Sequence, residues 1–100
     1  MVKHIVCFKL KESAEGATKA ENARKAKELL DSLANKVPGV QRLEVGINFV
    51  QDPAAYDLAL YTEFATREAL QAYASHPEHQ KVVQFISRVR ESRVVVDYEV

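Results

Sequence analysis

Three segments of the chain alternate between apolar and polar residues with a period of two: residues 2–10, 40–50 and 56–64. This period is typical of strands whose two faces meet different surroundings. The valine-rich segment 92–99 predicts a fourth strand. Turn residues from 51 to 55 join the second and third segments, so these two are expected to form an antiparallel hairpin.

A first helix is predicted between the first two strands. Thr18 and Glu21 form the pattern Thr-x-x-Glu, which opens a helix by bonding its free N–H groups. Apolar residues then recur at steps of three and four to about Lys36, and Pro38-Gly39 ends the helix. Residues 11–17 show no period and are predicted to form a loop.

Two more helices are predicted before the last strand. Thr66 is placed to cap a helix over residues 67–75. Pro77 cannot continue that helix without cost, but it suits the first turn of a new one. The order β-α-β-β-α-α-β predicts an α+β domain over residues 1–100, a ferredoxin-like four-stranded antiparallel sheet with helices on one face.

The second face of this sheet would have no helical cover, although several strands place apolar residues on it. Pairing with a second copy, sheet against sheet, would bury this face and close a dimeric α/β barrel. The equal numbers of basic and acidic residues, 14 of each, agree with self-association. The sequence therefore predicts a homodimer.

Charge and composition bound the other partners. A chain without net charge has no field that gathers phosphates or anionic lipids, so neither nucleic acid nor a membrane is an expected partner. A single cysteine, Cys7, excludes an internal disulfide and fits a reducing compartment. No apolar run approaches the ~20 residues needed to span a bilayer. The cytoplasm is the expected location.

The stretch from Leu70 to His79 gathers titratable side chains at helical spacing among apolar neighbours. His79 precedes the buried stripe of the third helix, where it is either a packing residue or a group that accepts a proton. Tyr73 is either a core tyrosine or a donor to a developing oxyanion. His4 alternates with apolar residues of the first strand, as a core-edge histidine or a pocket base.

His76 precedes Pro77, which places it at the joint between two helices. His76, His79 and His4 could in principle bind a metal, but no cysteine pair or carboxylate cluster supports such a site, and none is predicted. Cys7 shares the face of Ile5 and is expected to be a small hydrophobe of the dimer interface. The tract Arg88–Arg93 mixes both charges, as solvated faces do.

Three stretches resemble one protein family. The opening Val-Lys-His-Ile-Val of residues 2–6, the segment 56–61 and the motif Tyr73-x-x-His76-Pro77-x-His79 look like the stress-responsive dimeric α/β-barrel (Dabb) domain. The resemblance implies the same fold and dimer. In a polyketide cyclase of similar layout, a tyrosine and a histidine from this helical stretch act without metal or organic cofactor, beside a histidine of the first strand.

The resemblance thus implies catalytic roles for Tyr73, His79 and His4, with no cofactor. The first helix lacks aromatic residues and the chain lacks tryptophan, so the cyclase's substrate is not implied. A cavity between sheet and helices, binding a small hydrophobic or aromatic ligand, is expected to be lined by His4, Val6, Phe8, Leu58, Leu60, Tyr73, His76, His79, Val82, Val83 and Ile86. Three functions follow as hypotheses: a ligand-binding domain, a cofactor-independent proton-transfer enzyme, or a module that only assembles.

Overall fold

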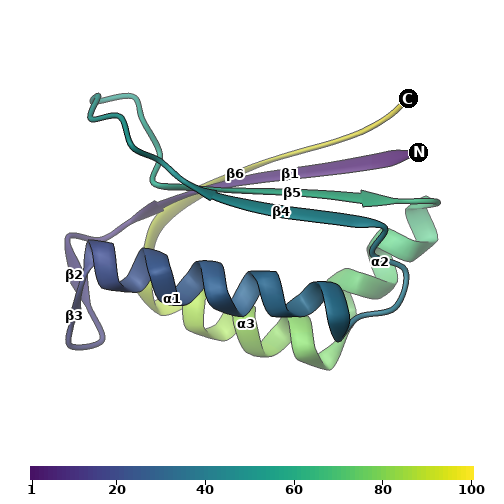
Figure 1. Cartoon of the computed structure of the whole chain (residues 1–100), viewed down its shortest axis with the longest axis horizontal. Coiled ribbons are helices and arrows are strands. Elements are labelled where there is room, and N and C mark those ends of the chain that lie inside the picture. The colour runs from purple at the N-terminus through teal and green to yellow at the C-terminus, as the bar shows by residue number, and fades with distance from the viewer.

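The computed structural model covers residues 1–100 and has a four-stranded antiparallel sheet with helices on one face (Figure 1). The spatial order of the strands is β4-β5-β1-β6. α1 and α3 run beneath the sheet and α2 lies at one end of it. The predicted α+β class and ferredoxin-like layout are confirmed. The main elements are β1 (Val2–Leu10), α1 (Lys19–Ser32), β4 (Arg42–Ile47), β5 (Leu58–Phe64), α2 (Arg67–Ser75), α3 (Pro77–Val89) and β6 (Arg90–Glu99).

Each helix begins at the residue that its sequence indicates. The Thr18 hydroxyl accepts from the Glu21 N–H while the Glu21 carboxylate accepts from the Thr18 N–H, which completes the capping box of α1. Thr66 caps α2 by accepting from the Ala69 N–H. α3 has Pro77 in its first turn, as predicted. No helix of the protein is long and apolar enough to cross a membrane.

The core fills the space between the inner face of the sheet and the helices. The central strand β1 contributes Val2, Val6, Phe8 and Leu10 to it, and Ala23 and Ala26 of α1 are buried. Phe64 on β5 packs against Tyr73 on α2, with ring centroids 5.2 Å apart. The apolar members of the core are Val2, Val6, Phe8, Leu10, Ala23, Ala26, Leu30, Leu33, Val37, Val45, Leu58, Leu60, Phe64, Tyr73, Val82, Phe85, Ile86 and Val89.

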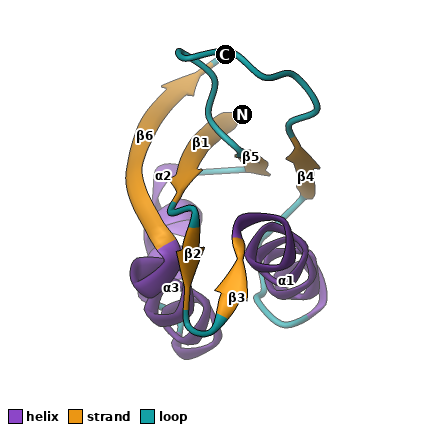
Figure 2. Ribbon diagram, turned by 90° about the vertical axis from the view of Figure 1, so that its left-hand side faces the viewer, coloured by secondary structure: helices purple, strands orange, loops and turns teal.

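Residues 11–17 are not the plain loop that was predicted. Two short strands, β2 (Ser13–Ala14) and β3 (Ala17–Thr18), pair as a hairpin at the end of the molecule (Figure 2). Glu15 and Gly16 both have positive φ, 52° and 73°, as the tight turn of a two-residue hairpin requires. Strands of two residues are too short for a period to reveal them.

The second strand ends earlier than predicted. Alternation over residues 40–50 placed Phe49 on one face of the strand with Val45 and Ile47, but β4 ends at Ile47 and Phe49 is 95% exposed. The Asn48 side chain donates to the carbonyls of Val50 and Tyr56 and accepts from the Val50 N–H. These bonds turn the chain into a loop, which rises above the sheet on the face away from the helices (Figure 1).

Further boundaries differ from the prediction by a few residues, and β4 begins at Arg42 rather than at residue 40. α1 stops at Ser32 and is continued by the 3-10 turn η1 (Leu33–Asn35) rather than by regular helix to residue 36. β5 begins at Leu58, two residues later than expected. β6 begins at Arg90, directly after α3, because Arg90 already has extended backbone angles, φ −84° and ψ 144°.

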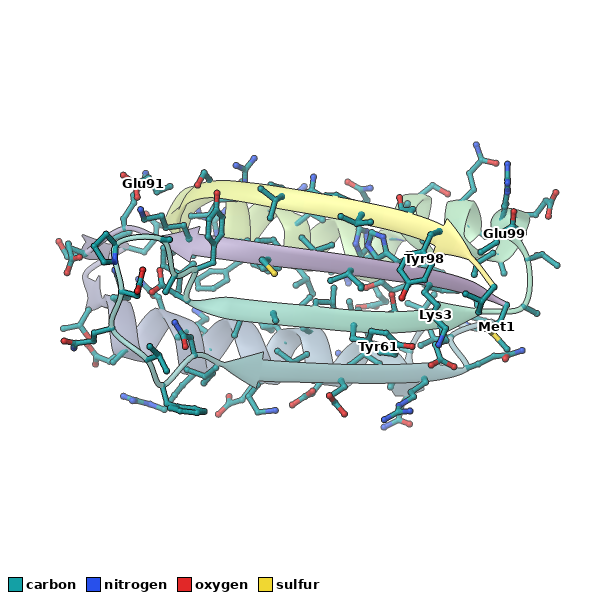
Figure 3. The ribbon with its side chains drawn as sticks, turned by 90° about the horizontal axis from the view of Figure 1, so that it is seen from above. Met1, Lys3, Tyr61, Glu91, Tyr98 and Glu99 are labelled. Atoms are coloured by element: carbon teal, nitrogen blue, oxygen red, sulfur yellow. The ribbon has the colours of Figure 1, made fainter.

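The outer face of the sheet has no helix over it (Figure 3). Lys3, Tyr61 and Tyr98 stand on this face near the end where the two termini lie. The Lys3 ammonium donates to the Tyr61 hydroxyl at 2.8 Å, and that hydroxyl donates to Glu63 at 2.5 Å. The remaining outward side chains on β1, β5 and β6 are mostly apolar and include Ile5, Cys7, Ala59, Val94 and Val96.

Candidate functional site

A cavity of about 290 Å³ lies between the inner face of the sheet and the helices. Strands β1, β5 and β6 form one side of it, and α1, α2 and α3 form the other. Ten of its fifteen lining residues are hydrophobic and five are polar. The lining comprises His4, Val6, Phe8, Leu30, Leu60, Leu70, Tyr73, Ala74, His79, Gln80, Val82, Val83, Ile86, Arg90 and Arg93.

Tyr73 comes from the last turns of α2 and is 1% exposed. Its hydroxyl is buried and has no hydrogen-bond partner in the protein. Burial raises the pKa of Tyr73 to about 12, so the hydroxyl keeps its proton and remains a donor without an acceptor. An unmet buried donor costs about 1–3 kcal/mol, so this group can gain free energy from an added acceptor.

His79 lies in the first turn of α3, and its ring centroid is 4.4 Å from that of Tyr73. Its Nδ1 lies 2.9 Å from the Ala74 carbonyl oxygen. Because a carbonyl only accepts, Nδ1 carries the hydrogen and Nε2 of the neutral ring keeps a lone pair. Burial lowers the pKa of His79; the bond to Ala74 opposes this effect, and the charges of His4 and Arg93 add to it. His79 is therefore a neutral base near pH 7.

The His4 side chain extends from β1 toward Tyr73, and it is 12% exposed. Its ring stands edge-on to Tyr73 with centroids 6.4 Å apart. Nδ1 is hydrogen-bonded to the carboxylate of Asp97, the residue opposite His4 on β6. The carboxylate fixes the orientation of the imidazole and makes Nδ1 the donor. Three rings from three elements thus meet at one end of the cavity.

Nine of the eleven residues predicted to line the cavity do so, but Leu58 and His76 do not. Leu58, the first residue of β5, lies on the inner face of the sheet. It is 2% exposed and belongs to the core. His76 is the N-cap of α3: its Nδ1 accepts from the Glu78 N–H at 3.1 Å. That bond holds the ring at the helix joint, where the sequence had placed the residue itself.

Six residues that line the cavity were not predicted from the sequence: Leu30, Leu70, Ala74, Gln80, Arg90 and Arg93. Leu30 belongs to the predicted apolar stripe of α1, so the stripe was a usable signal. Arg90 and Arg93 lie in the tract that was interpreted as a solvated face. Arg93 pairs with Phe8 across β1 and β6, and this register turns it toward the helix side of the sheet. A correct β1–β6 register would have found it.

A larger hollow, about 620 Å³, lies between the start of α1 and the loop that follows β4. Three of its charged groups already have partners. Lys19 is 3.1 Å from Glu12 and 3.7 Å from Asp57, and Asp57 also accepts from the Leu10 N–H. The protein has no group of three or more His, Cys, Asp or Glu side chains placed to hold a metal ion. The cavity at Tyr73 is therefore the better candidate site.

The fold and this cavity define a class: ferredoxin-like α+β domains with an apolar pocket between sheet and helices. The sequence matches the Stress responsive A/B Barrel Domain (Dabb) family over residues 2–100, and the chain belongs to that family. The family expected from the three sequence stretches is thus confirmed.

Relatives agree with this assignment. An uncharacterized protein of Streptomyces coelicolor is 30% identical over 100 residues and is matched over 99% of each chain. A dimeric protein of unknown function and ferredoxin-like fold from Bacteroides fragilis is 35% identical, with a TM-score of 0.82 over 99% of this chain and 95% of that one. Hydroxynitrile lyase from Passiflora edulis shares the fold at 17% identity, with a TM-score of 0.81 over 99% and 92%.

Proposed function

We propose that this protein is a homodimer that binds a small, mostly apolar ligand in the cavity between sheet and helices. The carrying observation is the Tyr73 hydroxyl, a buried donor without a partner on a residue of the cavity wall. A protein core seldom leaves such a group unmet, since its desolvation costs about 1–3 kcal/mol. A ligand oxygen that reaches the hydroxyl offsets this cost, and the apolar walls bind the rest of the ligand.

Dimer formation rests on the outer face of the sheet. Val94 and Val96 are 48% and 58% exposed there, beside the aromatic ring of Tyr98 at 42%. A contiguous apolar surface of this kind is unusual on a monomer. The similar Bacteroides fragilis protein is dimeric. We therefore assign the outer face to contact with a second copy, sheet against sheet.

Ligand binding is tested by thermal denaturation with a panel of small hydrophobic acids, phenols and ketones. Val83 lines the cavity and is 41% exposed, so Val83→Trp should fill the cavity from its rim without disturbing the core. Gln84, the next residue of α3, is exposed and outside the lining, and Gln84→Trp is the matched control. Stabilisation of the wild type and Gln84→Trp but not Val83→Trp is expected. If no compound stabilises the wild type, the proposed ligand function fails.

A second candidate is a cofactor-independent proton-transfer enzyme. It is favoured by the tautomer of His79, whose Nε2 lone pair is available while Nδ1 is held by Ala74. Nε2 would remove a proton from a carbon next to a ligand carbonyl. The C–H electron pair moves into an enolate, and the enolate oxygen accepts a hydrogen bond from Tyr73. In a β,γ-unsaturated ketone, return of the proton to the γ carbon shifts the double bond and gives isomerisation. Attack of the enolate carbon on a second carbonyl of the ligand gives ring closure, and the new alkoxide takes the proton back from Nε2.

Proton abstraction is separable from binding. In D2O, the wild type should speed deuterium incorporation at the carbons beside the carbonyl of 4-phenylbutan-2-one, followed by NMR. His79→Gln should abolish this acceleration, while its amide spectrum stays that of a folded protein. If the protein binds the ketone but deuterium incorporation proceeds only at the rate found in buffer, the enzyme hypothesis fails and the protein only binds the ligand. If the protein neither binds the ketone nor speeds its exchange, the hypothesis of a module that only assembles is favoured.

A further inference from the structure

The cavity lining is positively charged in a chain that is neutral overall. Arg90 and Arg93 are among its fifteen residues, and no aspartate or glutamate is. Both arginines come from β6, the edge strand that passes α3. Arg90 is half-buried, and a half-buried guanidinium on an apolar wall is costly to desolvate unless something pairs with it.

Neither arginine has a structural partner. Three other arginines of the chain form ion pairs: Arg42 with Glu44, Arg67 with Glu99 and Arg88 with Glu15. Arg90, which is half-buried, and Arg93, which is exposed, form neither an ion pair nor a side-chain hydrogen bond. The inward-facing carboxylate nearest to them along β6 is Asp97, which is engaged by His4. The two guanidinium groups are thus free to bind an anion.

We propose that the ligand is an amphiphilic anion whose carboxylate is bound by Arg90 and Arg93, with its apolar part along Phe8 and Ile86. This inference rests on the proposed ligand function and names the ligand class. A guanidinium matches a carboxylate with two parallel hydrogen bonds, a geometry that lysine lacks. The lining therefore combines an anion-binding pair with an otherwise apolar wall.

The position of the arginines also orients the ligand. His79 is in the first turn of α3 and Arg90 follows its last residue, a span of about 16 Å at the rise of an α-helix. Arg93 pairs with Phe8, four residues along β1 from His4, and its charge acts on His79, whose pKa it helps to lower. The carboxylate is accordingly bound on the β6 side of the cavity, and the rest of the ligand reaches Tyr73 and His79. A ligand of medium length, with one terminal anionic group, fits this arrangement.

The test uses three probes of one shape: 3-phenylpropanoate, 3-phenylpropanamide and 3-phenylpropan-1-ol. Calorimetry on the wild type should show the carboxylate binding at least about tenfold tighter than the two neutral probes, since charge-assisted hydrogen bonds exceed neutral ones. The double variant Arg90→Gln, Arg93→Gln should lose that preference while its affinity for the alcohol is unchanged. Arg24→Gln is the control, because Arg24 is exposed on α1, unpaired and outside the lining.

The outcomes separate this inference from the function on which it rests. Equal binding of all three probes to the wild type would overturn the anion assignment and leave an apolar ligand site. A carboxylate preference that survives in the double variant would overturn the assignment to Arg90 and Arg93. Failure of every probe to bind, with no stabilisation by the wider panel, would overturn both. Loss of preference in Arg24→Gln would point to a general effect of net charge and would equally contradict the proposal.

Discussion

The rings of Tyr73 and His79 pack against each other across the joint between α2 and α3, with centroids 4.4 Å apart and planes inclined at 49°. Pro77 creates this contact. It ends one helix and starts the next, so residues six positions apart meet on one cavity wall. Each residue is left with one unused group: the hydroxyl of Tyr73 and Nε2 of His79. The contact thus joins a donor and a base in one apolar setting.

Removing the Tyr73 hydroxyl should stabilise the free protein. Tyr73→Phe deletes a buried donor that has no acceptor, so the free energy of unfolding should rise by about 1–3 kcal/mol. Tyr61→Phe is the control, because the Tyr61 hydroxyl bonds to both Lys3 and Glu63, and its loss should cost about 0.5–1.5 kcal/mol. Urea denaturation measures both. A clear loss of stability in Tyr73→Phe would show that the hydroxyl has a partner in solution.

His79 should make stability depend on pH. Its pKa in the folded protein lies below the ordinary value of 6.5, so the unfolded chain binds its proton more readily. The stability of the wild type relative to His79→Gln should therefore be constant above pH 6.5 and fall as the pH drops through that value. His4 and His76 are present in both proteins, so the difference between the two curves reports on His79. A difference that grows in favour of the wild type on acidification would contradict the lowered pKa.

His76 should contribute to stability rather than to chemistry. Its Nδ1 accepts from the Glu78 N–H and caps α3. His76→Ala should lower the free energy of unfolding by about 1 kcal/mol, and His76→Asn, which keeps a cap acceptor, should recover most of the loss. Ligand affinity should change little in either variant. A large loss of affinity in the stable His76→Asn protein would place the imidazole in the site after all.

The sequence was most informative where a period ran long enough. Alternation over 2–10 and the stripe of α3 placed Val6, Phe8 and Val82 on the inner side of the fold. The prediction was wrong at Phe49. There the alternation of the sequence continues past the end of β4, and the side-chain hydrogen bonds of Asn48 turn the chain away from the sheet. The bond from the Val50 N–H to Asn48 is an Asx-turn, a local motif that the period-two pattern does not register.

The polar part of the candidate site divides in the same way. His4, Tyr73 and His79 were singled out as titratable side chains at apolar positions. Arg90 and Arg93 were not, because their tract contains both charges and its facing depends on the register between β1 and β6. That register includes a shift between Lys9 and Leu10, which no residue pattern announces. Long-range pairing, rather than composition, decides which arginines reach the cavity.

The proposed dimer interface can be broken at β6. Val96 points outward from the sheet and is 58% exposed, whereas its neighbour Val95 points to the helix side and is 40% exposed. A twofold interface presents Val96 twice, and burying a valine is worth about 1.5–3 kcal/mol. Val96→Lys should thus weaken the dimer by roughly 100-fold or more, and Val95→Lys should not. Sedimentation equilibrium decides, and a monomeric wild type at micromolar concentration would contradict the interface itself.

The central claim is that the cavity beside Tyr73 and His79 binds a ligand, and an NMR titration tests it most directly. Adding 3-phenylpropanoate to the ¹⁵N-labelled protein should shift the signals of Tyr73, His79, Val83 and Ile86, including the side-chain nitrogens of His79. The same titration should leave Val83→Trp unchanged. Saturable shifts confined to these residues would support the site. Shifts confined to the outer face of the sheet, or none with any compound that stabilises the protein, would contradict it.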